Sequence, residues 1–181
     1  MIAYVADEAH YGAVVARMAD VAHTLWLGTA DLKDLYVARP GARRPRPGGQ
    51  RDRAEPLLGV LAGLVTRGVT VRLLHAKEPG PNFRADFDRY PVLVDGLERA
   101  LCPRVHFKLV IFDLVMAYIG SANLTGAGVG MKSDTRRNFE AGILTDEPAL
   151  LSAAVEQFDA VWRGDGCPGC GRRQFCADPI A

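Results

Sequence analysis

The residues with the clearest chemical meaning lie in the stretch 104–125, where polar side chains interrupt apolar, β-branched runs. His106 and Lys108 are two positions apart, and in a β-strand such residues point to the same face. An imidazole and an ammonium group would therefore enter one space. The first run ends at Asp113 and a second apolar run returns over residues 115–119, which predicts a β-hairpin.

The second run ends in Gly120, Ser121 and Asn123. The hairpin would bring their hydroxyl and carboxamide to the end that carries the imidazole and the ammonium group. This set suits a phosphodiester, because Lys108 offers charge to a non-bridging oxygen and His106 can attack phosphorus or move a proton. Ser121 and Asn123 would orient the phosphate, and no metal ligand set is needed. Any one of these residues, taken alone, could be an ordinary polar group at a strand end.

These residues resemble a known signature. His106-x-Lys108, Asp113 and Gly120-Ser121-x-Asn123 resemble the H-x-K-x4-D-x6-G-S-x-N pattern of the phospholipase D superfamily, and the Asn-Phe-Glu at 138–140 is similar to its downstream N-x-E. In that family the glutamate hydrogen-bonds the catalytic histidine and fixes its tautomer, a role that the resemblance gives to Glu140. The R-G-V-T-V-R run at 67–72 is also similar to a strand entry common in the family. The resemblance covers roughly residues 5–162.

The resemblance implies a fold, a mechanism and an assembly. The expected fold is α/β, with a mixed, largely parallel sheet flanked by helices on both faces. Family members use two copies of the motif, one histidine becoming phosphorylated while the other protonates the leaving group. Because this chain has one H-x-K, the resemblance implies a homodimer in which two copies of His106 share one active site. The implied catalytic set is His106, Lys108, Asp113, Ser121, Asn123 and Glu140, with Gly120 beside the substrate.

Asp113 belongs to the signature, but its odd spacing from Lys108 favours a role in stabilising the hairpin over contact with substrate. The implied activity is a phosphodiesterase that needs no metal cofactor for catalysis.

The choice of substrate rests on residues 39–53, which hold six arginines, one acidic residue, and several prolines and glycines. This composition predicts a flexible basic loop, in which Arg43, Arg44 and Arg46 are candidate contacts to a polyanion. A solvated arginine-rich insertion is the equal alternative. Small single-motif members that resemble this chain include bacterial endonucleases, so DNA or RNA is favoured. The alternatives are phospholipase D-type action on phospholipid headgroups, or a non-catalytic nucleic-acid-binding module of a larger defence or repair assembly.

Composition limits the class of protein. With 181 residues, 49% hydrophobic and 24% charged, the chain can bury one ordinary core, which excludes general disorder and favours a single domain over residues 1–164. A net charge of +1 gives no overall signal for nucleic acid or an anionic membrane. The start lacks the features of a signal peptide and no run is long enough to span a membrane, so a cytoplasmic protein is expected.

Periodicity predicts the elements that position the candidate site. Asp7 is expected to cap a helix whose apolar positions continue to Leu25, with His10 and His23 in solvated or satisfied surface roles. The further expected elements are a strand at 25–29, a helix at 57–65, a strand at 69–74, a short helix at 92–101, a strand at 138–144 and a helix at 146–162. Residues 78–91 are expected to be a loop, whose aromatic residues form a substrate rim or simply pin the loop to the core.

The C-terminal tail, residues 165–181, is cysteine-rich, with Cys167, Cys170 and Cys176 within ten positions. In a cytosolic protein this spacing favours a structural zinc ion, because a C-x2-C turn presents two thiolates to one ion. Cys102 is the candidate fourth ligand, and His75 is a weaker one. Free thiols, a disulfide and an iron–sulfur cluster are the alternatives.

Overall fold

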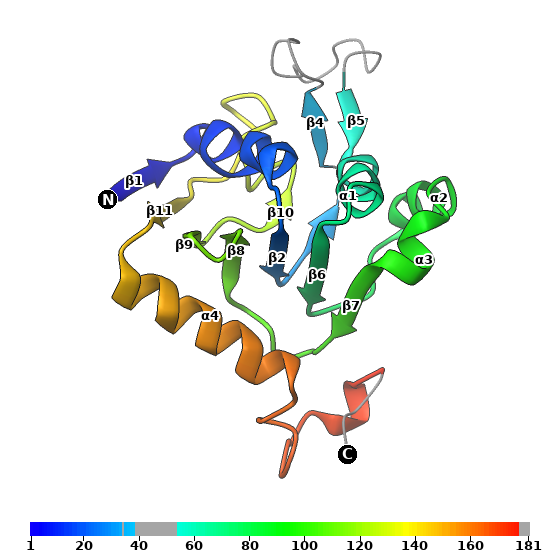
Figure 1. Ribbon diagram of the computed structural model, residues 1–181. Coiled ribbons are helices and arrows are strands. Elements are labelled where there is room, and N and C mark those ends of the chain that lie inside the picture. Colours follow the sequence, from blue (N-terminus) through cyan, green and yellow to red (C-terminus); the bar gives the residue numbers. More distant parts are fainter. Residues whose placement is uncertain (34, 39–53, 178–181) are drawn as a thin grey trace.

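A seven-stranded β-sheet with helices on both faces forms the centre of the protein, with strand order β1-β11-β9-β8-β2-β6-β7 (Figure 1). The computed structural model describes residues 1–33, 35–38 and 54–177. The strands of this sheet are β1 (Ile2–Ala6), β2 (Thr24–Thr29), β6 (Thr70–His75), β7 (Leu97–Leu101), β8 (Lys108–Phe112), β9 (Met116–Gly120) and β11 (Ala141–Thr145). Two short pairs lie outside it: β3 (Leu32–Lys33) with β10 (Leu124–Thr125), and β4 (Tyr36–Ala38) with β5 (Ala54–Pro56).

The sheet is mixed. The neighbours β2, β6 and β7 pair in parallel, whereas the pairs β1·β11, β11·β9, β9·β8 and β8·β2 are antiparallel. These registers make five of the seven strands run in one direction, with β8 and β11 opposed. The expected α/β class with a mixed sheet is confirmed, and the parallel pairings are confined to one half of the sheet.

Helices cover the sheet on both sides. The helix α4 (Pro148–Trp162) packs on one face, and α1 (Leu57–Thr66) packs on the other with the helical turns η1 (Tyr11–Val15) and η2 (Ala16–Asp20). Strand β8 contributes side chains to the apolar layers on both faces of the sheet. Leu109 and Ile111 pack on the α4 side, and Val110 and Phe112 pack on the α1 side. Every residue of β8 is therefore buried.

An aromatic stack holds α4 against the sheet. The rings of Trp26 and Phe158 are stacked with centroids 5.1 Å apart, and Phe158 is stacked on Trp162 at 5.9 Å. The guanidinium carbon of Arg72 lies 4.8 Å from the Trp26 ring and 5.2 Å from the Trp162 ring, which adds a cation–π contact to each. Phe158 is fully buried, and Trp162 packs against the same cluster.

The first twenty residues agree with expectation only in part. Residues 2–6 form the edge strand β1, and the expected helix is present as continuous helical backbone over residues 9–20, mostly with the π and 3-10 geometry of η1 and η2, before the chain enters β2 at Thr24. Asp7 caps no helix. It has a positive φ of 45° and its Oδ1 accepts the backbone N–H of Glu140. His10, expected at the surface, is fully buried, whereas His23 is exposed as expected.

Residues 78–101 also differ. The expected loop contains the helix α2 (Pro81–Asp88), which begins with proline at its first position, a favourable place for a residue without an N–H. Its Phe83 and Phe87 pack against the core, as loop-pinning aromatics would. The expected helix at 92–101 ends early: α3 (Val92–Gly96) is followed by the edge strand β7, whose exposed Glu98 and Arg99 suit a sheet edge. The predicted elements at 57–65, 69–74 and 146–162 are confirmed as α1, β6 and α4.

The β8–β9 hairpin is locked at its turn by one carboxylate. Asp113 and Leu114 have positive φ angles of 50° and 55°, and the Asp113 side chain accepts the backbone N–H groups of Ala22, His23 and Thr24 at 3.0, 2.6 and 2.9 Å. Partial burial raises the pKa of this carboxyl, but the three N–H groups outweigh it and the net pKa is lowered. The turn is thereby tied to the entry of β2.

Replacement of Asp113 by alanine should lower the free energy of unfolding by about 1–2 kcal/mol at neutral pH, because three N–H groups lose a charged acceptor. A depressed acid pKa stabilises the fold above the unfolded-state pKa of about 3.9, and the contribution is lost as the pH falls through the lower folded-state pKa. Urea titrations should therefore show a difference in the free energy of unfolding between wild type and Asp113→Ala at pH 7, and this difference should become smaller in acid. Asp20→Ala, at an exposed aspartate, is the charge-matched control. An Asp113→Ala protein as stable as this control would contradict the assignment.

Candidate active site

The candidate site lies at the border of the central sheet that is formed by strand ends, and this border, not the edge strands β1 and β7, is the edge meant for the site. Strands β2, β6 and β9 end there at Thr29, His75 and Gly120, and β8 begins there at Lys108, which pairs with Gly120. In sheets with parallel strands, ligands bind at the carboxyl ends of the strands. The sheet thus gathers polar residues from several distant segments at the edge where a ligand is expected.

Lys108 and His106 share one space, as expected, although His106 precedes β8. The Lys108 side chain is only 7% exposed, whereas His106 is exposed. The Lys108 Nζ donates a hydrogen bond to the carbonyl oxygen of His106 at 2.7 Å and lies 3.3 Å from its Nδ1. Burial lowers the pKa of Lys108, and the negative charge of Glu140 acts in the opposite direction. An accessible imidazole therefore stands beside a largely buried ammonium group.

Asn123 is held in one orientation by the loop after β2. Its Oδ1 accepts the backbone N–H groups of Ala30 and Asp31 at 3.2 and 3.1 Å, and the Thr29 hydroxyl at 3.3 Å. With its oxygen fixed in this way, the carboxamide presents its NH2 group on the opposite side. Asn123 can therefore act as a hydrogen-bond donor in a defined direction.

Glu140 joins Ser121 rather than His106. The Ser121 hydroxyl donates to Glu140 Oε2, and Asn138 Nδ2 donates to Oε1 at 3.0 Å. Ser121 Oγ also accepts the backbone N–H of Ala141 at 3.0 Å. Within the described part of this single chain, the expected bond between Glu140 and His106 is therefore not formed. The carboxylate instead fixes the hydroxyl at the end of β9.

Tyr118, a buried side chain that packs beneath Gly120 and Gly142, was not predicted from the sequence. Tyr118 is 1% exposed, and a Cβ on Gly120 would lie 2.2 Å from its hydroxyl, while a Cβ on the paired Gly142 would lie 2.5 Å from its ring. Burial raises the pKa of Tyr118 to about 12, so the phenol stays neutral. The buried His10 ring meets it edge-on at 5.3 Å. Glycines opposite each other on neighbouring strands were the available signal for a large side chain beneath them.

Among the described site residues that were predicted, Asp113 is not at this edge. Asp113 lies at the opposite end of the hairpin, since Lys108 pairs with Gly120 while Asp113 follows Phe112 at the turn. The predicted catalytic role of Asp113 therefore does not fit its position: the carboxylate anchors the turn, in agreement with the stabilising role that its odd spacing favoured. Arg43, Arg44 and Arg46 lie outside the described residues.

The four cysteines line one cavity of about 250 Å³ at the base of the segment that leads to His106. Among the residues that the structure describes, no three His, Cys, Asp or Glu side chains stand close enough to hold a metal ion, so the expected zinc site is not confirmed. His75 is occupied elsewhere. Its Nδ1 donates to the Lys77 carbonyl and its Nε2 accepts from Arg99 Nε, both at 2.8 Å, and burial lowers its pKa.

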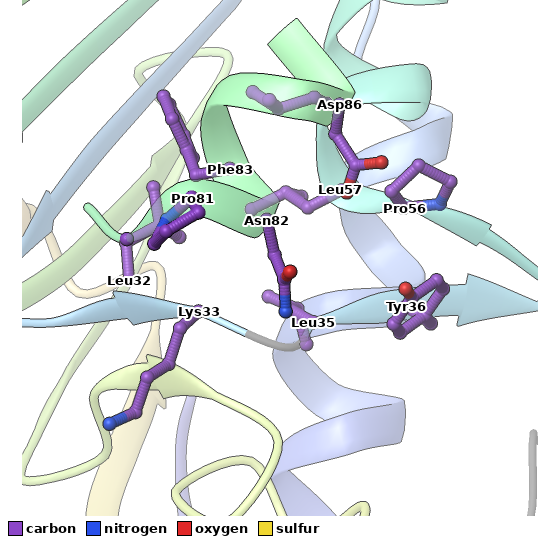
Figure 2. Close-up of a pocket in the computed structure, with 12 residues that line it drawn as sticks. Leu32, Lys33, Leu35, Tyr36, Pro56, Leu57, Pro81, Asn82, Phe83 and Asp86 are labelled. Carbon is purple, nitrogen blue, oxygen red and sulfur yellow. The ribbon is translucent and has the colours of Figure 1, made fainter.

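A second cavity, of about 210 Å³, lies between the β3–β4 segment and α2 (Figure 2). Leu32, Leu35 and Tyr36 form one wall, and Pro81 and Phe83 lie across from them. Its described lining includes none of the predicted site residues. Among the described helices, none is long and apolar enough to cross a membrane.

Comparisons with known proteins identify a family and similar folds. The family model described as cardiolipin synthase, PLD-like domain, matches residues 53–162. NucT from Helicobacter pylori has a similar structure, with a TM-score of 0.59, 12% identity, and coverage of 88% of this chain and 94% of that one. Nuc from Salmonella typhimurium, a phospholipase D family member, gives 0.58 and 18%, with 90% and 93% covered. Phosphatidylserine synthase from Haemophilus influenzae gives 0.56 and 15%, with 90% of this chain but 38% of that chain covered.

Among curated protein sequences, none matches this chain. The solved structures are too distant in sequence to carry more than the fold. The family match covers more than half of the chain, including β8 and β9 with the residues of the signature. The chain therefore belongs to the phospholipase D superfamily of phosphodiesterases and transferases, through its PLD-like domain.

Proposed function

We propose that the protein is a phosphodiesterase that cleaves DNA or RNA through a phosphohistidine at the interface of a homodimer. The observation that carries the proposal is the contact between the exposed His106 ring and the buried Lys108 ammonium group, 3.3 Å apart at the edge of the sheet. A nucleophile must be accessible, whereas a cation that neutralises phosphoryl oxygens is more effective when water is excluded. The pair combines both properties.

In this mechanism His106 of one subunit attacks phosphorus, and the P–O bond to the leaving group breaks. His106 of the second subunit protonates the departing oxygen and then activates the water that hydrolyses the phosphohistidine. Lys108 and the NH2 group of Asn123 bind the non-bridging oxygens, and Glu140 holds the Ser121 hydroxyl in place beside them. No step requires a metal ion.

A second copy of the chain is required because one chain supplies one such histidine. The exposed apolar side chains near the candidate site support association: Tyr4 on the edge strand β1 is 75% exposed, and Phe139, next to Glu140, is 90% exposed. Large apolar groups left in water in this way favour contact with another surface.

Two observations favour nucleic acid over lipid. The likeness extends over 94% and 93% of the NucT and Nuc chains but over only 38% of the phosphatidylserine synthase chain. The arginines of residues 39–53, outside the described structure, add the charge that a polyphosphate would need. Action on phospholipid headgroups is the competing activity that the first experiment must separate.

His106→Ala should lower the rate of plasmid nicking at least ~1000-fold, because the nucleophile is lost, while wild type stays active for minutes after EDTA is added. The assay is gel analysis of plasmid DNA beside hydrolysis of phosphatidyl lipid vesicles. The control is His23→Ala, at an exposed histidine far from the site. Cleavage of lipid but not plasmid would show that the substrate is a phospholipid and not nucleic acid. Full activity of His106→Ala would show that His106 is not the nucleophile.

Asn123→Asp should lower kcat/KM about 100-fold or more with little change in melting temperature. The aspartate can still accept the N–H groups of Ala30 and Asp31, but it replaces a donor with a negative charge beside the phosphate. Asn82→Asp, on α2, introduces the same change away from the site. Equal kinetics for the two variants would show that Asn123 only fastens the loop after β2.

A heterodimer of one wild-type and one His106→Ala subunit should be nearly as inactive on plasmid as the homodimer of the variant, because either the nucleophile or the proton donor is missing. Two affinity tags allow its purification after co-expression, and light scattering should give twice the chain mass of 19.6 kDa. Half of the wild-type activity would instead indicate two independent sites, and a monomer would exclude the shared site.

A further inference from the structure

The C-terminal segment, residues 165–177, lacks the apolar residues that normally hold a chain segment in place. None of its side chains is buried, and those that are partly buried are Cys167, Cys170 and Cys176. Phe175, its single aromatic residue, is 60% exposed. A segment without buried apolar area cannot offset the entropy of ordering it, and small units of this kind usually depend on a metal ion or a disulfide. The side chains that face inward here are thiols.

Cys167 and Cys170 form a tight turn. The N–H of Cys170 donates to the carbonyl of Cys167 at 3.1 Å, and Gly169 supplies the positive φ of 69°. A C-x2-C turn of this kind presents two thiolates to one ion.

Cys176 lies beside the segment that contains Cys102. The Cys176 sulfur lies 3.8 Å from the carbonyl oxygen of Leu101, the residue before Cys102. All four sulfur-bearing residues line the same cavity of about 250 Å³. Arg104, Arg172 and Arg173 line it as well, and their positive charge would offset the net charge of about −2 on a zinc ion bound by four thiolates.

We propose that Cys102, Cys167, Cys170 and Cys176 bind one zinc ion that fastens the C-terminal segment to the residues leading into His106. As the side chains stand, the described thiols do not form a coordination shell. Binding therefore requires the four thiols to release their protons and to rotate toward the centre of the cavity, forming four Zn–S bonds. The backbone contact is already present, since Arg104 Nη1 donates to the Gly166 carbonyl at 3.0 Å.

The proposal is tested on the full-length chain purified without chelator. Elemental analysis should give one zinc ion per chain in wild type and at least a tenfold loss in Cys102→Ser, which lies outside the cysteine-rich segment. Removal of zinc with 1,10-phenanthroline should lower the melting temperature by roughly 5 °C or more and open the bonds after Arg172 and Arg173 to trypsin. Added zinc should reverse both changes. Gln174→Ala, an exposed change in the same segment, should keep its zinc.

Several results would overturn the proposal. These are four thiols that react freely with Ellman's reagent in wild type as purified without chelator, a disulfide found by mass spectrometry of the alkylated chain, iron in place of zinc, or full zinc content in Cys102→Ser. If the cysteine variants fail to fold, cobalt substitution of wild type decides, because thiolate ligands give intense charge-transfer bands in the near ultraviolet. None of these readouts depends on phosphodiesterase activity, so the zinc site and the proposed reaction can fail separately.

Discussion

The register between β8 and β9 determines where the candidate catalytic groups lie. Lys108 pairs with Gly120, so the start of one strand and the end of the next meet at one edge of the sheet. A shift by one residue would turn every side chain of β8 to the other face and would exchange the apolar layers under α1 and α4. Both layers are packed, and the Asp113 carboxylate fastens the turn, so the register has little freedom.

Two glycines near the candidate site leave space for the ring of Tyr118. Gly120 and Gly142 face each other across β9 and β11, and the Tyr118 ring fills the space that two Cβ atoms would take. The phenol accepts the backbone N–H of Ala122 at 3.3 Å, which supports the turn between Ser121 and Asn123 from below. A neutral, buried hydroxyl thus supports the short loop that holds the polar residues Ser121 and Asn123.

Much of the site could be read from the sequence because its parts are local. His106, Lys108 and the residues after Gly120 interrupt apolar runs, and a hairpin joins runs that are adjacent in the chain. The partners of these residues could not be read in this way. Asn123 is oriented by N–H groups about ninety positions away, and the edge strands β1 and β7 are short or charged, so periodicity does not reveal them.

The stack on α4 has a practical consequence for spectroscopy. The chain contains two tryptophans, Trp26 and Trp162, and both lie in the cluster that joins α4 to the sheet, each beneath the guanidinium group of Arg72. Intrinsic fluorescence therefore originates from one region and one contact. A change in emission reports the docking of α4 and carries no direct signal from the candidate active site, where extrinsic labels are needed.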